Sequence, residues 1–199
     1  MYSFIAAATW PLLHFAYRLR ADGLENLPEG SGFVLACNHV SSFDPWPLGM
    51  PLWPQRQLRF MAKSELYWWP LTIVLEGAGA FPVHRGQRDA QAIETAVELV
   101  RAGHPVAMFP EGTRRRKGLV KRFEARPRTG AARIALEGGV PLVPAAVAGT
   151  DGLTRFRRMR VAYGLPVDID DLRDREIGGA AKEATDRLME RILELEASL

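Results

Sequence analysis

A histidine and an aspartate five positions apart are the side chains of this sequence best suited to acid–base chemistry. They lie in the run NHVSSFDP of residues 38–45, directly after the apolar run 32–37. A neutral imidazole is the usual side chain for taking a proton from a hydroxyl near neutral pH. A carboxylate beside it can fix its tautomer and stabilise the imidazolium that forms. The run therefore predicts general-base catalysis, provided that the fold brings His39 and Asp44 together.

Local geometry decides whether these two side chains can meet. On one continuous helix, five residues correspond to a rotation of about 500°, which places His39 and Asp44 on different faces. The run 32–37 instead predicts a strand, and Asp44-Pro45 is typical of a helix N-cap followed by proline at the first helical position. We therefore expect the pair to meet across a turn. An ordinary N-cap and a polar strand end also fit these residues, so the short pattern needs support from the rest of the chain.

Two further stretches place an arginine after a predicted strand. The run VAMFPEGTR of residues 106–114 ends in a turn that carries an acid, a glycine, a hydroxyl and a guanidinium, and GAFPVHR of residues 79–85 also ends in an arginine. Glycine lets backbone approach a ligand closely, and arginine binds phosphate through its forked guanidinium. A polar surface loop would have the same composition, so each stretch alone leaves both interpretations open.

Taken in order, these stretches resemble the glycerolipid acyltransferase family of the His-x4-Asp type, which makes phosphatidic acid from lysophosphatidic acid. The resemblance runs from about residue 21 to 165. It departs from the family pattern at Arg115, where a serine is usual, and at His84, where an acid usually precedes the arginine. The segments that carry the resemblance are the four motif-like runs 38–44, 79–85, 109–114 and 140–144, and the connecting runs 63–66 and 130–135.

The resemblance implies acyl transfer from a thioester, either acyl-coenzyme A (acyl-CoA) or acyl carrier protein (acyl-ACP), to the hydroxyl of a lysophospholipid such as 1-acyl-sn-glycerol-3-phosphate. It implies that His39 is the general base, that Asp44 orients it, and that the acceptor oxygen attacks the thioester directly. No G-x-S-x-G serine elbow is present, which fits direct attack. No metal or redox cofactor is needed. The residues implied at the acceptor's phosphate are Arg85, Glu111, Gly112, Thr113, Arg114 and Lys63, where Glu111 holds an arginine or a loop donor.

Other acceptors and other classes of protein stay open at this point. Glycerol phosphate or a lyso-amino-acid lipid would need the same chemistry. A non-catalytic module for anionic membranes would need only apolar and basic segments. Basic residues cluster in 114–128 and 155–160, and such clusters suit anionic lipid, phosphorylated cosubstrates, nucleic acid or plain solvent exposure. No recognisable nucleic-acid module accompanies them, so we expect no nucleic-acid partner.

The composition fits one globular domain. Of 199 residues, 47% are hydrophobic and 25% charged, and the formal net charge of +3 is too small to identify a partner. The single cysteine, Cys37, lies in an apolar run and has no second cysteine in the chain to pair with. A reducing compartment is therefore favoured.

The N-terminal residues are apolar and are followed by Arg18 and Arg20. A helix over residues 1–17 spans about 25 Å, short of the roughly 30 Å hydrocarbon layer, and the stretch lacks the basic start of a signal peptide. We expect residues 1–20 to form an interfacial helix at the cytoplasmic face of the cell membrane, and residues 21–199 to form the catalytic domain. A helix packed in the core is the alternative. All five tryptophans lie in the first 69 residues, which suits either a membrane boundary or core packing.

Apolar runs and helical periodicity alternate along the rest of the chain. This alternation predicts an α/β fold, in which a mixed, mostly parallel central sheet is flanked by helices. Strands are predicted at 32–37, 57–61, 80–83, 105–109, 142–148 and 159–163, and helices at 45–53, 64–76, 88–102, 128–138 and 179–197.

Overall fold

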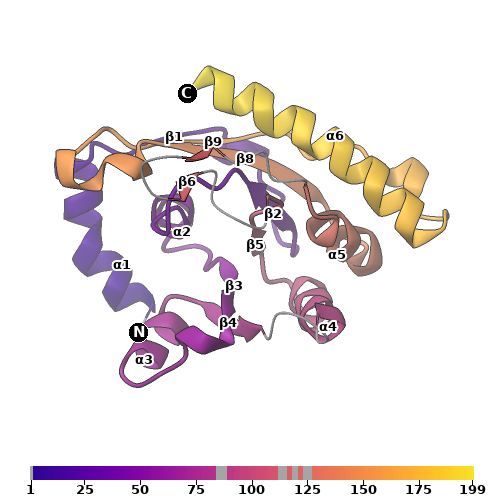
Figure 1. Cartoon of the computed structure of the whole chain (residues 1–199), viewed down its shortest axis with the longest axis horizontal. Helices are drawn as coiled ribbons and strands as arrows, with labels where there is room; N and C mark the ends of the chain where they lie inside the picture. Colours follow the sequence, from indigo (N-terminus) through magenta and orange to yellow (C-terminus); the bar gives the residue numbers. More distant parts are fainter. Residues whose placement is uncertain (1, 84–88, 112–115, 118–120, 123–126) are drawn as a thin grey trace.

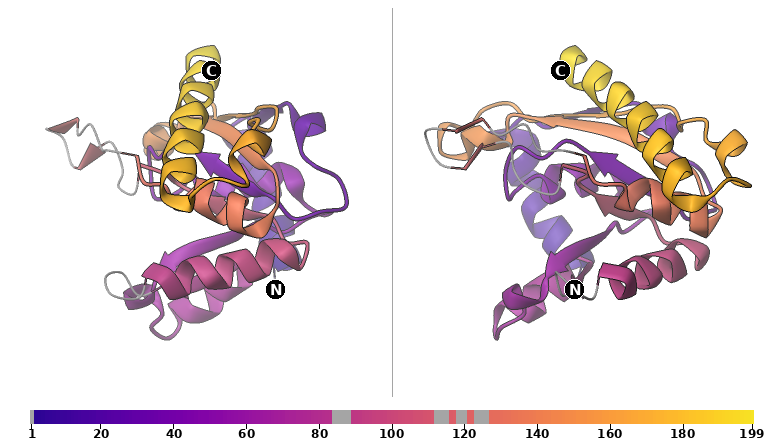
Figure 2. Two further views of the ribbon diagram at one scale, coloured as in Figure 1. Left: turned by 90° about the vertical axis from the view of Figure 1, so that its right-hand side faces the viewer. Right: turned by 45° about the vertical axis from the view of Figure 1, so that its right-hand side comes forward.

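The computed structural model describes residues 2–83, 89–111, 116–117, 121–122 and 127–199. In this part of the chain, seven strands form a sheet in the order β1-β9-β8-β2-β5-β3-β4, with helices on both faces (Figure 1). The α/β fold expected from the sequence is confirmed. A separate pair of short strands, β6 (Arg116–Lys117) and β7 (Lys121–Arg122), projects from the body of the molecule (Figure 2).

Five neighbouring strands of the sheet are parallel: β8 (Leu142–Ala148), β2 (Val34–Cys37), β5 (Val106–Met108), β3 (Arg59–Lys63) and β4 (Ala80–Val83). The strands β9 (Arg160–Tyr163) and β1 (Arg20–Asp22) are parallel to each other, and β9 is antiparallel to β8. The expectation of a mostly parallel sheet is therefore confirmed. Because the carboxyl ends of the five parallel strands meet at one edge, that edge is where a ligand site is expected in an open α/β sheet.

Strand β2 is buried on both faces, which explains its continuous apolar run. Successive strand residues point to opposite faces. Leu35 and Cys37 pack on one side, together with residues of the N-terminal helical segment and of the segment that follows Asp44. Val34 and Ala36 pack on the other side. The helices of this second side are α4 (Asp89–Arg101), α5 (Gly130–Gly138) and α6 (Ile177–Ser198).

Two predicted helices are each divided into an α-helix and a 3₁₀ turn. The predicted helix 64–76 is instead a 3₁₀ turn, η4 (Ser64–Leu66), followed by helix α3 (Leu71–Gly77). Proline has no N–H and disfavours helical geometry in the residue before it, so a helix running through Pro70 is unfavourable. The predicted helix 45–53 is α2 (Pro45–Gly49), continued by the 3₁₀ turn η3 (Met50–Leu52). Strand β1 was not predicted, because its three residues are partly exposed and form no apolar run.

The N-terminal segment forms helix α1 (Tyr2–Pro11) and a π-helical turn, η1 (Leu12–Ala16). One side of the segment packs on the core through Ala6 and Leu13. The other side exposes Phe4 and Phe15, each with 76% of its surface accessible. No helix in the described ranges is both long and apolar enough to cross a membrane.

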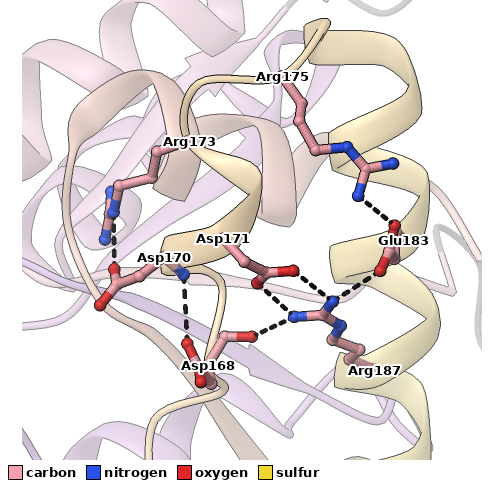
Figure 3. A network of polar contacts seen from close by, with 7 residues as sticks. All are labelled: Asp168, Asp170, Asp171, Arg173, Arg175, Glu183 and Arg187. Carbon is pink, nitrogen blue, oxygen red and sulfur yellow. Dashed lines mark hydrogen bonds and ion pairs between the residues drawn. The ribbon is translucent and has the colours of Figure 1, made fainter.

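An acid–arginine network connects the N-terminal half of α6 to the 3₁₀ turn η6 (Asp170–Leu172) (Figure 3). Arg187 binds both carboxylate oxygens of Asp171 at 2.7 and 2.8 Å, and it also binds Glu183 at 2.6 Å. Glu176 caps α6 by accepting the N–H groups of Gly178 and Gly179, each at 2.8 Å. These charge-assisted bonds fix where the long helix begins against the sheet.

We predict that this network weakens in acid. The pKa values of Asp171 and Glu183 lie below their ordinary 3.8 and 4.5, chiefly because Arg187 hydrogen-bonds the charged forms. Backbone amides of Gly179 and Gly178 lower the pKa of Glu176 in the same way. A group with a lowered folded-state pKa adds stability above its unfolded-state pKa, and that stability is lost as the pH falls through the folded value.

Arg187→Ala should therefore lower the melting temperature at neutral pH and make progressively less difference as the pH falls below about 4. Thermal unfolding followed by circular dichroism across this range measures the effect. Arg191→Ala is the matched control, because Arg191 lies on the same helix and pairs with Glu194. A constant difference between Arg187→Ala and the parent at every pH would contradict the assignment.

Candidate active site

The structure brings His39 and Asp44 into contact across the turn that follows β2. His39 Nδ1 lies 2.7 Å from Asp44 Oδ2. The Asp44 side chain is fully buried, whereas that of His39 keeps 17% of its surface exposed. Among the described residues, the other ring nitrogen, Nε2, has no hydrogen-bond partner. The pair therefore has the geometry that general-base chemistry needs, with Nδ1 held by the carboxylate and Nε2 left for a substrate.

The Asp44 carboxylate does not cap helix α2, although the sequence predicted an N-cap. Asp44 stands at the N-cap position, but its side chain makes no capping bond. It turns back instead, and Oδ2 accepts the N–H groups of Val40 and Ser41 at 2.7 and 2.8 Å. Its other oxygen, Oδ1, accepts the hydroxyl of Thr150 at 2.5 Å. A carboxylate only accepts hydrogen bonds, so its contact with His39 suits the tautomer that carries the proton on Nδ1.

Asn38 joins the turn to the neighbouring strand β8. Its amide donates to the Val147 carbonyl at 3.1 Å and accepts the Val147 N–H at 2.8 Å. Asn38 is completely buried. Its side chain therefore continues the β2–β8 pairing one step beyond the backbone ladder, which ends at Cys37 and Ala145. These two hydrogen bonds fix the position at which the chain leaves the sheet, and therefore the position of His39.

Helix α2 is fixed to the sheet at its far end. The Tyr163 hydroxyl on β9 donates to the Leu48 carbonyl at 2.7 Å. Burial raises the pKa of the Tyr163 hydroxyl well above its usual 10.0, so the group stays a donor through the neutral range. Near the start of α2, Trp46 Nε1 donates to Thr9 Oγ1 of α1 at 3.1 Å. The helix that follows Asp44 is thus held from both sides.

The segment after β5 packs directly on the histidine. The ring of Phe109 stacks on His39, with ring centroids 4.2 Å apart and planes inclined at 23°. Glu111, predicted at the acceptor site, is buried two residues further on. The carboxyl ends of β2 and β5 are adjacent in the sheet, so the structure brings the first and third motif-like runs together at His39.

The other predicted site residues are described in part or not at all. Lys63 is the last residue of β3, so its backbone lies at the same edge of the sheet as His39, while its side chain is outside the described atoms. Arg85, Gly112, Thr113 and Arg114 lie outside the described residues.

Sequence reasoning missed Thr150 and Asn38 as partners of the site. Thr150 lies 106 positions from Asp44 in the chain, and a lone threonine after a strand has no distinctive pattern.

Two cavities, of about 470 and 490 Å³, lie away from the His39–Asp44 pair. One is lined by the start of α1, the end of α3 and residues 54–59, and the other by α4 and α5; neither is lined by His39.

Comparison with known proteins places the chain in a family. A family model described as Acyltransferase matches residues 18–148, which is more than half of the chain. The chain belongs to the acyltransferase family. It is 35% identical over its whole length to the 1-acyl-sn-glycerol-3-phosphate acyltransferase of Bacillus subtilis, of which it covers 98%. The family inferred from the motif-like runs is therefore confirmed, and the protein is an acyltransferase.

Other relatives match over part of their length. A 1-acyl-sn-glycerol-3-phosphate acyltransferase of Borreliella burgdorferi is 31% identical, and the match covers 67% of this chain and 52% of that protein. The crystal structure of the 1-acyl-sn-glycerophosphate (LPA) acyltransferase PlsC from Thermotoga maritima superposes with a TM-score of 0.64 at 23% identity, over 98% of this chain and 80% of that one. At this identity, the structural match supports the fold.

Proposed function

We propose that this acyltransferase moves a fatty acyl group from acyl-CoA or acyl-ACP to the free hydroxyl of 1-acyl-sn-glycerol-3-phosphate, which gives phosphatidic acid. The observation that carries the proposal is the 2.7 Å contact between His39 and the buried Asp44. Relatives named for this acceptor support its choice, because one of them matches the chain from end to end.

The chemistry follows from the geometry of the pair. His39 Nε2 takes the proton of the acceptor hydroxyl while that oxygen attacks the thioester carbonyl. The new C–O bond forms, the C–S bond breaks, and the leaving thiolate takes the proton back from the imidazolium. The charge of Asp44 stabilises the imidazolium, and the two backbone amides on Oδ2 keep the carboxylate in place. The acyl group passes directly to the acceptor without an acyl-enzyme.

The acceptor's phosphate belongs, in this proposal, at the carboxyl edge of the sheet beside His39. Guanidinium groups suit phosphate because their N–H donors match two of its oxygens. Glu111 is buried near Phe109 and serves the loop rather than the phosphate, since like charges repel. The residues assigned to the phosphate and its loop are Lys63, Arg85, Glu111, Gly112, Thr113 and Arg114.

The exposed apolar residues support a site of action at the membrane surface. Besides Phe4 and Phe15 on the N-terminal segment, Trp69 exposes 80% and Trp68 58% of its surface. Tryptophan prefers the boundary between hydrocarbon and water. A lipid acceptor reaches such an enzyme from the bilayer, so we place residues 1–20 as an interfacial element on the cytoplasmic face, with residues 21–199 as the catalytic part.

Removing the proposed base should abolish most turnover. We expect His39→Ala to lower kcat by about 10²–10⁴-fold, because that is the usual contribution of a general base, while circular dichroism and melting temperature report an intact fold. Thiol release from acyl-CoA in the presence of 1-acyl-sn-glycerol-3-phosphate measures kcat. His104→Ala is the matched control, because His104 lies between α4 and β5, away from the site. Parental turnover by a folded His39→Ala would refute the mechanism.

The same assay identifies the acceptor. Glycerol phosphate and a lyso-amino-acid lipid, offered beside 1-acyl-sn-glycerol-3-phosphate, should give lower kcat/KM than the phosphate-bearing lysophospholipid. If either of them were preferred, the acyltransferase chemistry would stand and the acceptor would change. If none of the three acceptors were acylated, the proposed class of acceptor would be wrong.

The exposed aromatic residues of the N-terminal segment should carry membrane affinity. Replacing both Phe4 and Phe15 by serine should weaken binding to phosphatidylglycerol vesicles roughly tenfold, because each ring then loses apolar burial in the bilayer. Vesicle co-sedimentation measures the bound fraction. The matched control is the double variant Leu165→Ser, Leu193→Ser. These two leucines lie outside the N-terminal segment, and 71% and 53% of their surface is exposed. Equal loss in both double variants, or in neither, would contradict the interfacial assignment.

A further inference from the structure

Among the residues that bind the Asp44 carboxylate, Thr150 is the most distant in sequence. Its Oγ1 donates to Asp44 Oδ1 at 2.5 Å, a short distance typical of a hydroxyl bound to a charged oxygen. Both residues are buried, with 1% and 0% of their surface exposed. The three N–H donors to the carboxylate, from His39, Val40 and Ser41, all bind Oδ2. Oδ1 is thus held by the Thr150 hydroxyl.

The backbone before Thr150 has a shape that only glycine adopts without strain. Strand β8 ends at Ala148, and Gly149 then takes a φ of +86°. A Cβ at Gly149 would lie 2.1 Å from the Arg158 carbonyl oxygen. The turn leads into the 3₁₀ segment η5 (Thr150–Arg155) at the carboxyl end of β8, beside β2. The chain therefore turns sharply enough to bring Thr150 over the residues that follow β2.

We propose that Thr150 is a positioning residue for acyl transfer, and that its hydroxyl holds Asp44 in the rotamer that keeps His39 in its Nδ1–H tautomer. This inference rests on the proposed function of the His39–Asp44 pair. The terminal torsion of an aspartate is broad. With Oδ1 bound, the carboxylate is fixed at both oxygens and cannot rotate away from the imidazole. Thr150 also lies outside residues 18–148, the segment matched by the family model.

Two substitutions separate the hydroxyl from the rest of the side chain. Thr150→Val keeps the shape and removes the donor, whereas Thr150→Ser keeps the donor and removes the methyl group. Thr185 provides a matched control, because it is also buried and its hydroxyl bonds a carbonyl, that of Ala181 at 2.7 Å in helix α6. Thr185→Val therefore removes an equally buried hydroxyl far from the site.

Steady-state acyl transfer from acyl-CoA to 1-acyl-sn-glycerol-3-phosphate provides the first measurement. We expect Thr150→Val to lower kcat about 10- to 100-fold, the range expected for a misplaced catalytic group, with both KM values close to the parent's. Thr150→Ser should restore kcat to near the parental value, and Thr185→Val should leave it unchanged. If Thr150→Ser were as slow as Thr150→Val, restoring the hydroxyl would not restore kcat, and the proposal would fall.

Nitrogen-15 NMR of histidine-labelled enzyme provides a measurement that does not depend on turnover. The chain has four histidines, and His39→Gln assigns the His39 resonances. At a pH where the ring carries a single proton, the parent and Thr150→Ser should show that proton on Nδ1 of His39, whereas Thr150→Val should show a mixture of tautomers. An unchanged ring in Thr150→Val, together with parental kcat, would overturn the proposal.

The two measurements also distinguish failure of this inference from failure of the proposed function. If the parent enzyme acylated no acceptor, the proposed function would fail, and the NMR comparison would still decide whether Thr150 holds Asp44 and His39. If Thr150→Val did not fold, Thr150→Ala would serve in its place, because it removes the same hydroxyl without placing a methyl group against the carboxylate. A folded Thr150→Ala with parental kcat and an unchanged His39 ring would equally refute the positioning role.

Discussion

The burial of one charged side chain constrains much of this structure. Asp44 has no exposed surface, and a carboxylate in that position is tolerated only when hydrogen bonds replace its water. The replacement comes from a histidine ring, two backbone amides of the same turn and a hydroxyl that follows β8. The turn after β2, the start of α2 and the start of η5 must all be in place together. The site is therefore complete only when these parts of the fold are in place.

The parallel sheet explains why residues far apart in the sequence meet there. Strands β2, β5, β3 and β8 all end at one edge, which gathers His39, Phe109, Glu111 and Thr150, together with the backbone of Lys63. The N-terminal segment touches the same region. Thr9 accepts a hydrogen bond from Trp46 on α2, and the Tyr17 hydroxyl donates to the Leu153 carbonyl on η5. The segment that we place at the membrane surface thus contacts both the helix that follows Asp44 and the 3₁₀ segment that supplies Thr150.

Sequence patterns predicted the elements and the turn that neighbouring residues determine. They missed the contacts between residues that are far apart in the chain. The buried strands and the long helices were predictable from apolar runs and helical periodicity, and the His39–Asp44 turn from Asp44-Pro45. The predicted N-cap role was wrong, because the Asp44 side chain accepts the N–H groups of the preceding residues Val40 and Ser41 and makes no bond to helix α2. Thr150 and Asn38 were not predictable, because their roles arise from pairing between β2 and β8, more than a hundred residues apart. The prediction of one helix over 64–76 was wrong, because Pro70 lacks the N–H that a continuous helix needs there.

The kcat of Asp44→Asn shows whether the buried carboxylate serves catalysis. Asparagine keeps the size of aspartate but removes the charge, and its amide group can present a donor where His39 needs an acceptor. We predict that kcat falls by about 10²–10⁴-fold at neutral pH, because the imidazole loses its oriented tautomer and the charge that stabilises its protonated form. A folded Asp44→Asn enzyme with the parental kcat would show that the buried carboxylate serves the fold alone.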